Sequence, residues 1–248
     1  MAVEQTRKTA LITGGATRLG AATARLLHAA GYDIVIHYRN SSDNAAKLAA
    51  ALNSLRERSA TMLQGDLLEE GIIPNLVEQA AAFNQRLDAL INNASSFYAT
   101  KMGHVEAEQW EDLVGTNMKA PFFLAQAAAP WLTESNGSIV NMVDVHGCRP
   151  KKDFAVYSMA KAANAMMVKV LARELGPYVR VNGVAPGIIL WPEHGLADEE
   201  KTRMLSRTAL QRPGSPDDIA STIRFLVTEA DYITGQIIAV DGGRMTQQ

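Results

Sequence analysis

Residues 10–20 read ALITGGATRLG, and this stretch decides the fold. It passes from an apolar run through a glycine-containing turn into an Ala-rich amphipathic segment over 18–30. A turn between a strand and a helix can bring backbone N–H groups up to a pyrophosphate, so the stretch predicts a dinucleotide site. The spacing GxGxxG is absent, because Arg18 stands between Gly14 and Gly20 where a third glycine is usual. A tight turn without a ligand is therefore the alternative.

The same alternation of short apolar runs with longer amphipathic segments continues along the chain. Strands are expected at 10–12, 34–36, 61–63, 89–91, 138–140, 179–181 and 237–240. Helices are expected over 18–30, 42–57, 69–85, 106–132, 154–175 and 215–228. The last helix has a clear start, with Ser215 as its cap and Pro216 at its first position. Repeated βα units build a parallel sheet whose strands are buried on both faces, so we expect one α/β domain over 1–248.

Composition and charge exclude several classes of protein and leave small-molecule chemistry as the default. The chain has 248 residues, with 24 Lys plus Arg and 26 Asp plus Glu, so its formal net charge is −2. This charge gives no reason to expect nucleic acid or an anionic membrane as a partner. The single cysteine, Cys148, cannot form an internal disulfide, and no Cys/His spacing suggests a metal site. Because we find neither a signal peptide nor the roughly 18 apolar residues that span a bilayer, we expect a soluble cytoplasmic protein.

The end of the second expected strand indicates which dinucleotide binds. NAD sites usually have an acidic residue about 20 residues after the glycines, whereas NADP sites place Arg and hydroxyl groups there. Here residues 37–41 read HYRNS and contain no acidic residue. The guanidinium of Arg39 matches the geometry of a 2′-phosphate, and Ser41 can donate a hydrogen bond to it. We therefore predict NADPH; the alternative is a solvated Arg39 and a Ser41 that only caps the next helix.

Tyr157 and Lys161 lie four residues apart in an expected helix, so their side chains share one face. An unperturbed tyrosine has a pKa of about 10 and transfers protons poorly at neutral pH. A neighbouring ammonium stabilises the phenolate, so we expect Lys161 to lower the pKa of Tyr157. Lys161 can also hydrogen-bond the nicotinamide ribose. The pattern Tyr-x-x-x-Lys alone is common by chance, and a solvated helix face is the alternative.

Taken in order, the motifs of this chain resemble those of the short-chain dehydrogenase/reductase family over nearly its full length. The matching segments are Thr13-Gly14 to Gly20, Asp66-Leu67, Asn92-Asn93-Ala94, Asn117, Tyr157 with Lys161, Val181-Asn182 to Pro186-Gly187, and Thr234-Gly235 to Gly243. The resemblance implies a Rossmann-type, doubly wound parallel sheet made of the seven expected strands, and a homotetramer. It places Asp66 by the adenine and Asn93 by the adenosine ribose. Asn117 belongs to a water relay behind Lys161.

The resemblance also divides the chain and supplies further cofactor contacts. Residues 8–145 form the dinucleotide-binding part, and the irregular segment 186–212 is a substrate loop or lid, with a surface insertion as the alternative. The other cofactor contacts that it implies are Gly14, Arg18, Leu19, Gly20, His37, Tyr38, Arg39, Asn40, Ser41, Leu67, Ala94, Ser95, Lys161, Pro186, Gly187 and Ile189.

One position departs from the family. Most members have a serine about 13 residues before the tyrosine, and this chain has Asp144 there. A carboxylate beside a ketone oxygen would repel the developing alkoxide. Burial beside the cofactor would instead keep the Asp144 carboxyl protonated, so that it donates a proton through Tyr157. Such a pair suits reduction of a C=N bond, in which a ring nitrogen gains a proton as hydride reaches carbon. The alternative is that Asp144 only caps the following turn.

This triad of Asp, Tyr and Lys is similar to that of the pteridine reductase subgroup. In that subgroup an aromatic residue stacks the pterin against the nicotinamide, a serine contacts substrate and cofactor, and an arginine of the glycine turn reaches the pterin. Carried over, these residues are Phe97, Ser95 and Arg18; a core position is the alternative for Phe97, and the 2′-phosphate for Arg18. Trp191, with Pro192, is a further candidate for the wall of a substrate lid.

The sequence as a whole predicts an NADPH-dependent pteridine reductase that converts a dihydropterin or dihydrofolate to the tetrahydro form. Dihydromonapterin reductase is a close alternative, because its substrate differs chiefly in the pterin side chain. A carbonyl reductase of 3-oxoacyl thioesters or sugars is a second alternative, against which Asp144 argues. A dinucleotide-sensing module without catalysis is a third, against which Tyr157, Lys161 and Asn117 argue.

Overall fold

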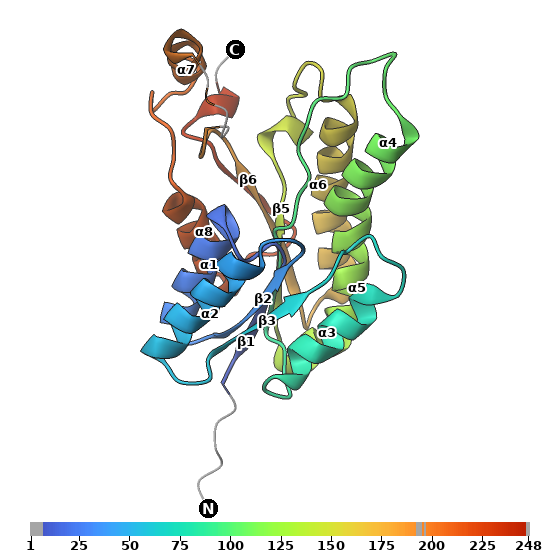
Figure 1. Ribbon diagram of the computed structural model, residues 1–248, viewed down its shortest axis with the longest axis vertical. Coiled ribbons are helices and arrows are strands. Elements are labelled where there is room, and N and C mark those ends of the chain that lie inside the picture. Colours follow the sequence, from blue (N-terminus) through green and yellow to red (C-terminus); the bar gives the residue numbers. More distant parts are fainter. Residues whose placement is uncertain (1–6, 192–194, 196, 247–248) are drawn as a thin grey trace, which may run out of the picture.

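The computed structural model describes residues 7–191, 195 and 197–246, which form a sheet covered by helices on both faces (Figure 1). Seven strands lie in the order β3-β2-β1-β4-β5-β6-β7, and every neighbouring pair is parallel. The strands are β1 (Thr9–Ile12), β2 (Asp33–Tyr38), β3 (Ala60–Gln64), β4 (Ala89–Asn92), β5 (Ser138–Met142), β6 (Arg180–Pro186) and β7 (Ile237–Val240). Each expected run falls on one of them, so the predicted Rossmann-type, doubly wound sheet is confirmed.

The helices form two layers (Figure 1). One layer consists of α1 (Arg18–Ala29), α2 (Ser42–Leu55) and α8 (Pro216–Thr228). The other consists of α3 (Ile72–Ala82), α4 (Ala107–Val114), α5 (Ala120–Ser135) and α6 (Ala155–Leu175). No helix in the described part of the chain is both long enough and apolar enough to cross a membrane.

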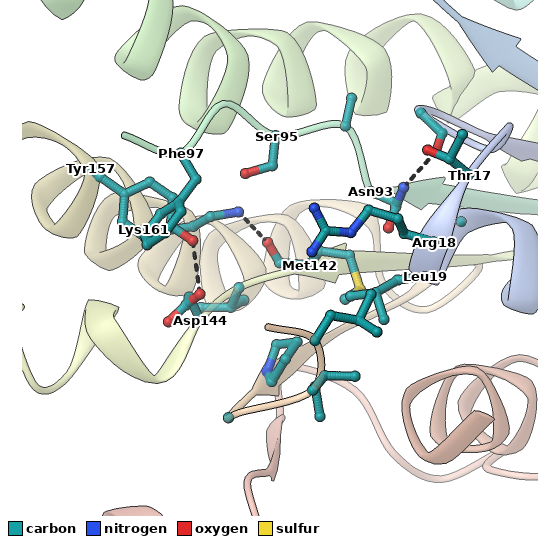
Figure 2. Close-up of a pocket in the computed structure, with 18 residues that line it drawn as sticks. Thr17, Arg18, Leu19, Asn93, Ser95, Phe97, Met142, Asp144, Tyr157 and Lys161 are labelled. Atoms are coloured by element: carbon teal, nitrogen blue, oxygen red, sulfur yellow. Dashed lines mark hydrogen bonds between the residues drawn. The ribbon is translucent and has the colours of Figure 1, made fainter. Parts of the chain in front are cut away.

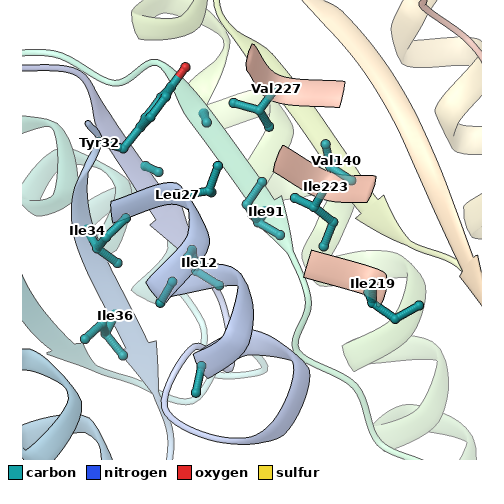
Figure 3. Close-up of a cluster of buried hydrophobic side chains, with 14 of the residues drawn as sticks. Ile12, Leu27, Tyr32, Ile34, Ile36, Ile91, Val140, Ile219, Ile223 and Val227 are labelled. Atoms are coloured by element: carbon teal, nitrogen blue, oxygen red, sulfur yellow. The ribbon is translucent and has the colours of Figure 1, made fainter. Parts of the chain in front are cut away.

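Two hydrophobic cores hold the layers against the sheet. Successive side chains of a strand point to opposite faces, so Ile12 packs on the side of α1 and α8, and Leu11 packs on the side of α3 and α5. Figure 3 shows the first core, a single cluster to which the sheet contributes Ile12 and Ile34, α1 contributes Leu27 and α8 contributes Ile223. All four of these side chains are 0% exposed, and each fully buried aliphatic side chain contributes about 1.5–3 kcal/mol of transfer free energy.

The strand order creates a crevice at the centre of the sheet. The chain runs from β1 outward to β2 and β3, and then crosses back to β4 on the other side of β1. In open parallel sheets, ligands bind outside the carboxyl ends of the two strands at such a reversal. Here the turn that follows β1 therefore meets the segment that follows β4.

The structure corrects two parts of the helical prediction. The helix expected over 106–132 is divided into α4, the π-helix η1 (Gly115–Lys119) and α5. Hydrophobic spacing does not locate this wide turn, because a π-helix is a single local turn inside a continuous helical segment. In the segment 186–212, which we expected to be irregular, α7 (Asp198–Leu205) forms with three acidic residues in its first turn.

The predicted start of α8 is confirmed. The hydroxyl of Ser215 accepts a hydrogen bond from the N–H of Asp218 at 3.2 Å, and the Asp218 carboxylate accepts from the N–H of Ser215 at 2.7 Å. This reciprocal pair is a capping box, and Pro216 follows it in the first turn.

Candidate active site

A cavity of about 400 Å³ opens at the carboxyl ends of the central strands. Four segments line it: the turn after β1, the segment after β4, the end of β5 together with α6, and the segment after β6. The lining residues are Gly14, Thr17, Arg18, Leu19, Gly20, Asn93, Ala94, Ser95, Phe97, Met142, Val143, Asp144, Tyr157, Lys161, Pro186, Gly187, Ile189 and Leu190. Figure 2 shows Arg18 and Ser95 directed into the same space as Tyr157 and Lys161.

The cavity brings together most of the site residues that the sequence predicted, but not all of them. Nine expected residues are not among those that line it: His37, Tyr38, Arg39, Asn40, Ser41, Asp66, Leu67, Asn117 and Trp191. The outer group, at the ends of β2 and β3, consists of Arg39, Asn40, Ser41, Asp66 and Leu67. The buried side chains are those of His37, Tyr38 and Asn117, and Trp191 lies in the loop after β6.

The glycine turn after β1 is shaped by close backbone contacts. Gly14 has φ +58°, and a Cβ added at Gly20 would lie 2.3 Å from the carbonyl oxygen of Gly14. Asn93 holds the turn, because its side-chain amide donates to the carbonyl oxygens of Thr13 at 2.9 Å and Gly14 at 3.0 Å. The hydroxyl of Thr13 in turn accepts from the N–H of Asn93 at 3.0 Å. The turn is thus fixed to the end of β4 before any ligand contact is made.

This turn fits the pyrophosphate of a dinucleotide. It leads into the N-terminus of α1, and the N-cap residue Thr17 makes no side-chain cap hydrogen bond there. The N–H groups of the first turn therefore have no capping side chain and carry the positive end of the helix dipole. Glycine at position 20 lets the start of α1 pack closely against the turn, because a Cβ there would collide with the Gly14 carbonyl oxygen. The residues that would hold the group are those of the turn and the first turn of α1.

Arg18 keeps the backbone of the glycine that it replaces. Its φ is +50°, in the left-handed region that glycine adopts freely and other residues adopt at a cost. The side chain is exposed and lines the cavity beside Leu19 (Figure 2). A strained residue whose side chain faces a cavity is retained for what the side chain does.

The structure corrects the expected roles of His37 and Tyr38, which are buried beneath the turn. The ring of His37 accepts at Nδ1 from the N–H of Gly14 at 3.3 Å, and its Nε2 lies 3.1 Å from the carbonyl oxygen of Gly65. Burial lowers the pKa of His37, so the neutral ring donates from Nε2 and accepts at Nδ1. Tyr38 is 6% exposed and packs in the hydrophobic core. The side chain of His37 thus supports the turn from below and that of Tyr38 belongs to the core, so neither side chain lines the cavity.

The outer group contains the charged residues expected near an adenosine. The guanidinium of Arg39 lies 3.6 Å from the carboxylate of Asp66, and both side chains are about half exposed. Asn40 is exposed, and Ser41 precedes α2 without making a side-chain cap hydrogen bond. The alternative role for Ser41, a cap of α2, is therefore not what its hydroxyl does in this structure. Leu67 differs from the rest, because it is buried and packs on the α3 side of the sheet.

Asp144 and Tyr157 are in direct contact. The hydroxyl of Tyr157 donates to Oδ2 of Asp144 at 2.8 Å, and Oδ1 accepts from the N–H of His146 at 2.8 Å (Figure 2). Tyr157 is 3% exposed, whereas Asp144 is only partly buried. Burial, followed by the charge of Asp144, raises the pKa of Tyr157 far above its ordinary value. The proton between the two groups is therefore on Tyr157.

Two expectations about this pair are thereby corrected. We expected Lys161 to lower the pKa of Tyr157, but the Lys161 Nζ lies 5.7 Å from the Tyr157 ring centroid while a carboxylate touches the hydroxyl. The nearer charge and the burial dominate. We also expected Asp144 to be buried beside the cofactor, but its side chain is partly exposed, and both of its oxygens accept hydrogen bonds.

Lys161 is the buried cation of the site. It is 2% exposed, and its ammonium donates to the carbonyl oxygen of Met142 at 2.8 Å (Figure 2). Burial lowers the pKa of Lys161 to about 8, and the charge of Asp144 acts in the opposite direction. Because the ammonium is anchored to the end of β5, it faces the cavity at a fixed place.

Asn117 lies behind the cavity on the π-helix η1. Its side-chain amide donates to the carbonyl oxygens of Leu113 and Ser96, each at 2.9 Å, and its Oδ1 accepts from the hydroxyl of Ser95 at 2.7 Å. Its own carbonyl oxygen accepts from the side chain of Asn164 at 2.8 Å. Asn117 thus fixes Ser95, which lines the cavity.

Sequence reasoning missed Asn164, which extends this buried network to the sheet. Asn141 of β5 donates to the Asn164 Oδ1 at 2.9 Å, and Asn92 of β4 donates to the Asn141 Oδ1 at 2.9 Å. Two signals were available: a polar residue inside each apolar strand, and Asn164 three residues after Lys161 on the same helix. Thr17, Met142, Val143 and Leu190 also line the cavity and were not selected.

Phe97 lies at the mouth of the cavity and is 50% exposed. One face stacks on Phe154 with the ring centroids 4.7 Å apart and an interplanar angle of 22°. Its contact with Tyr157 is edge-on, with centroids 4.8 Å apart. The alternative of a core aromatic is therefore wrong. In the loop after β6, Leu190 lines the cavity and Trp191 does not, whereas Pro192 lies outside the described residues.

Comparison with known proteins relates the whole chain to reductases. Residues 14–245 match the family described as enoyl-(acyl carrier protein) reductase. The chain is 36% identical to pteridine reductase 1 of Leishmania tarentolae, over 98% of both chains. It is 33% identical to the 3-oxoacyl-acyl-carrier-protein reductase of Staphylococcus epidermidis, over 95% of this chain and 98% of that protein. Each match spans the glycine turn, the Asp144 position and the Tyr157/Lys161 pair.

Proposed function

The chain belongs to the short-chain dehydrogenase/reductase family, and from that premise we propose that it reduces the ring of a dihydropterin or dihydrofolate with NADPH. The observation that carries the proposal is the 2.8 Å contact between Asp144 and the hydroxyl of Tyr157. A carboxylate at that place opposes the alkoxide that forms when a ketone is reduced. It suits a reaction in which a ring nitrogen must gain a proton.

The proton reaches the substrate through the Asp144 and Tyr157 pair. NADPH, when bound, supplies the hydride to a ring carbon. Tyr157 gives its hydroxyl proton to the adjacent ring nitrogen, and Asp144 returns a proton to Tyr157 so that no phenolate is left in the buried site. Asp144 can take that proton from water, because its side chain is partly exposed.

The other residues bind and orient. Lys161 holds a fixed ammonium that can donate to the nicotinamide ribose and that stabilises negative charge on Tyr157 as its proton leaves. Phe97 offers an exposed aromatic surface for a flat heteroaromatic ring, and such a stack adds about 0.5–1.5 kcal/mol beyond burial. Ser95, held by Asn117, and Arg18 lie at the same cavity and supply polar contacts to the ring.

Charge supports NADPH over NADH. Arg39, with Ser41 nearby, offers a guanidinium and a hydroxyl at the end of β2, where NAD sites have a carboxylate that accepts from the ribose. Asp66 pairs with Arg39 at the neighbouring strand and does not take that place. We expect the affinity for NADPH to exceed that for NADH, and an equal or stronger NADH affinity would contradict this.

A second candidate function is reduction of 3-oxoacyl thioesters. The 33% identity to a 3-oxoacyl-acyl-carrier-protein reductase favours it, and Asp144 argues against it. The substitution Asp144→Ser separates the two, because it supplies a neutral hydrogen-bond donor to a carbonyl and removes the acid needed by a ring nitrogen.

The experiment is a substrate panel followed by NADPH absorbance. The panel contains dihydrobiopterin, dihydromonapterin, dihydrofolate and an acetoacetyl thioester, each with the native chain, Asp144→Asn and Tyr157→Phe. We expect turnover of at least one dihydropterin, its loss in both variants, and NADPH binding retained in both. Turnover of the thioester without any pterin, or pterin turnover unimpaired in either variant, would refute the proposal.

We propose further that the chain works as a homotetramer. Exposed apolar side chains on α4, η1 and α5, namely Trp110, Met118, Phe122 and Phe123, offer a face that a second copy can cover. Light scattering during size exclusion tests this, and a monomer at micromolar concentration would contradict it.

A further inference from the structure

A second cavity, of about 460 Å³, lies on the other side of the loop that carries Asp144. Cationic side chains from three segments surround it: Arg149 and Lys151 from the loop between β5 and α6, Arg207 from the segment after α7, and Arg244 from the 3-10 helix η3 (Arg244–Thr246). We call these four residues the basic pocket. The sequence analysis selected none of them.

The tertiary fold assembles this pocket. The carbonyl oxygen of Gly242 accepts from the N–H of Leu210 at 3.0 Å, and Arg244 reaches the carbonyl oxygen of Met204 at 3.5 Å. These contacts hold the end of the chain against the segment around α7, in the upper part of the molecule in Figure 1. The four cations are therefore set around one space, where Arg149, Lys151 and Arg207 are exposed and Arg244 is partly buried.

Three cations of the basic pocket are held without a salt bridge. Among the described residues, Lys151, Arg207 and Arg244 form no ion pair. The nearby carboxylate of Asp241 accepts from the N–H groups of Gly243 at 2.8 Å and Met245 at 2.7 Å, and acts on Arg244 through its charge. Asp144, which accepts from Tyr157, acts on Lys151 through its charge, as Glu200 does.

The like charges act on one another. Burial lowers the pKa of Lys151; the charge of Asp144 opposes this effect and the charge of Arg244 adds to it. Burial likewise lowers the pKa of Arg244, and the charge of Arg207 adds to that effect against the charges of Asp241 and Asp144. A bound anion would relieve this repulsion, and a guanidinium fork fits either a carboxylate or a phosphate.

The basic pocket adjoins the candidate active site at Lys151. The ammonium of Lys151 lies 5.0 Å from the ring centroid of Phe97 and 4.0 Å from that of Phe154. Phe97 lines the first cavity, and Val145, which directly follows Asp144, lines the second. A substrate whose ring lies on Phe97 can therefore extend its tail past Lys151 into the basic pocket.

We propose that the basic pocket binds the anionic end of the substrate's tail, so that the preferred substrates carry two or more carboxylates or phosphates beyond the ring. The nature of the ring rests on the proposed function, whereas the pocket's preference for anions rests on its own charges. Carboxylates and phosphates share the chemistry that the pocket recognises, and the tests below distinguish them.

The first test compares kcat/KM for dihydrofolate, which carries two carboxylates, with that for dihydrobiopterin, whose tail is uncharged. The variants are Arg207→Gln, Arg244→Gln and the double variant, with Arg212→Gln as a matched control that lies outside the pocket. We expect each single variant to lower kcat/KM for dihydrofolate about tenfold, mainly through KM, because each removes one charge-assisted contact. Values for dihydrobiopterin should stay within about twofold. Equal losses on both substrates, or no loss on dihydrofolate, would overturn the proposal.

The second test does not require any pterin to be turned over. Calorimetry measures binding of 4-aminobenzoylglutamate and of inorganic triphosphate to the full chain with NADP⁺ present, so that the two arms report carboxylate and phosphate recognition. We expect binding in at least one arm, weakening with added salt, and its loss in the double variant. If no dihydropterin is reduced but this binding and its loss are seen, the pocket stands and the proposed function fails. Absence of binding in both arms, or equal binding by the double variant, would overturn the pocket itself.

Discussion

Replacement of Asp144 by Asn should lower the pKa of Tyr157 and remove the group that returns a proton to it. In the native chain the carboxylate lies 2.8 Å from the hydroxyl, so a phenolate there would face a like charge. At an effective dielectric constant of about 20, two charges at that separation interact by about 6 kcal/mol, which corresponds to a pKa difference of roughly four. Asp144 is partly exposed, and solvent screening reduces this pKa difference to about two.

Burial keeps the pKa of Tyr157 above its ordinary value even in the variant, because burial is the largest cause of the upward shift. The pKa of Lys161 should fall below its native value of about 8, since the charge of Asp144 raises it. Turnover of a dihydropterin should fall by about a hundredfold or more, as expected when a proton-transfer group is lost.

The assay is ¹³C NMR of the tyrosine ζ carbons during a pH titration, with Tyr157→Phe to assign the signal. Tyr98 serves as an internal control: burial, then its hydrogen bond with Asp112, raise its pKa to about 12, and Asp144 takes no part. We expect the Tyr157 signal to titrate at lower pH in Asp144→Asn while that of Tyr98 is unchanged. A Tyr157 pKa equal in the native chain and the variant would refute the electrostatic reasoning, and a shift of both signals would indicate a change of fold instead.

Three further predictions concern the turn after β1. Arg18→Gly should change the free energy of unfolding by less than about 1 kcal/mol, because relief of the strained φ of +50° offsets the extra freedom of the unfolded chain. It should also lower kcat/KM for the pterin; denaturation measures the first effect and kinetics the second. A larger loss of stability would show that the side chain holds the turn. Gly20→Ala should lower the free energy of unfolding by about 3 kcal/mol and weaken NADPH binding, since its Cβ would lie 2.3 Å from the Gly14 carbonyl oxygen. An unchanged melting temperature would contradict this. Burial lowers the pKa of His37, so its contribution to stability is full above the unfolded-state pKa of about 6.5 and is lost as the pH falls from there toward the folded-state pKa. The melting temperature of the native chain should therefore fall over that pH range more steeply than that of His37→Gln, and equal slopes would exclude His37 as the cause.

Much of the fold could be predicted from the sequence because the signals that specify it are local. Each buried strand reads as a short apolar run, and Ser215 with Pro216 marks the start of α8 within four residues. The order of the motifs selected much of the lining of the cavity for the same reason: the glycine turn, Asn93 and Pro186 sit where apolar runs end, and parallel strands end at one edge of the sheet. Tyr157 and Lys161 reach the cavity from α6.

Properties that depend on neighbours distant in sequence could not be predicted in this way. The pKa of Tyr157 is raised first by burial and then by the charge of Asp144, a residue 13 positions away whose contact with the hydroxyl the sequence does not show. The sequence predicts His37 as a cofactor contact, whereas its ring lies beneath Gly14. The π-helix around Asn117 is one local turn inside a continuous helical segment, so the spacing of apolar residues does not locate it.

The sequence by itself therefore determined the sheet, the glycine turn and the identity of the candidate catalytic residues, since short-range pattern and motif spacing encode them. Only the tertiary structure decided the protonation of the Asp144 and Tyr157 pair and the existence of the basic pocket. Lys151, Arg207 and Arg244 are separated by dozens of residues, and nothing local marks them as neighbours. Electrostatic energy depends on distance in space, and the packing of the chain sets that distance.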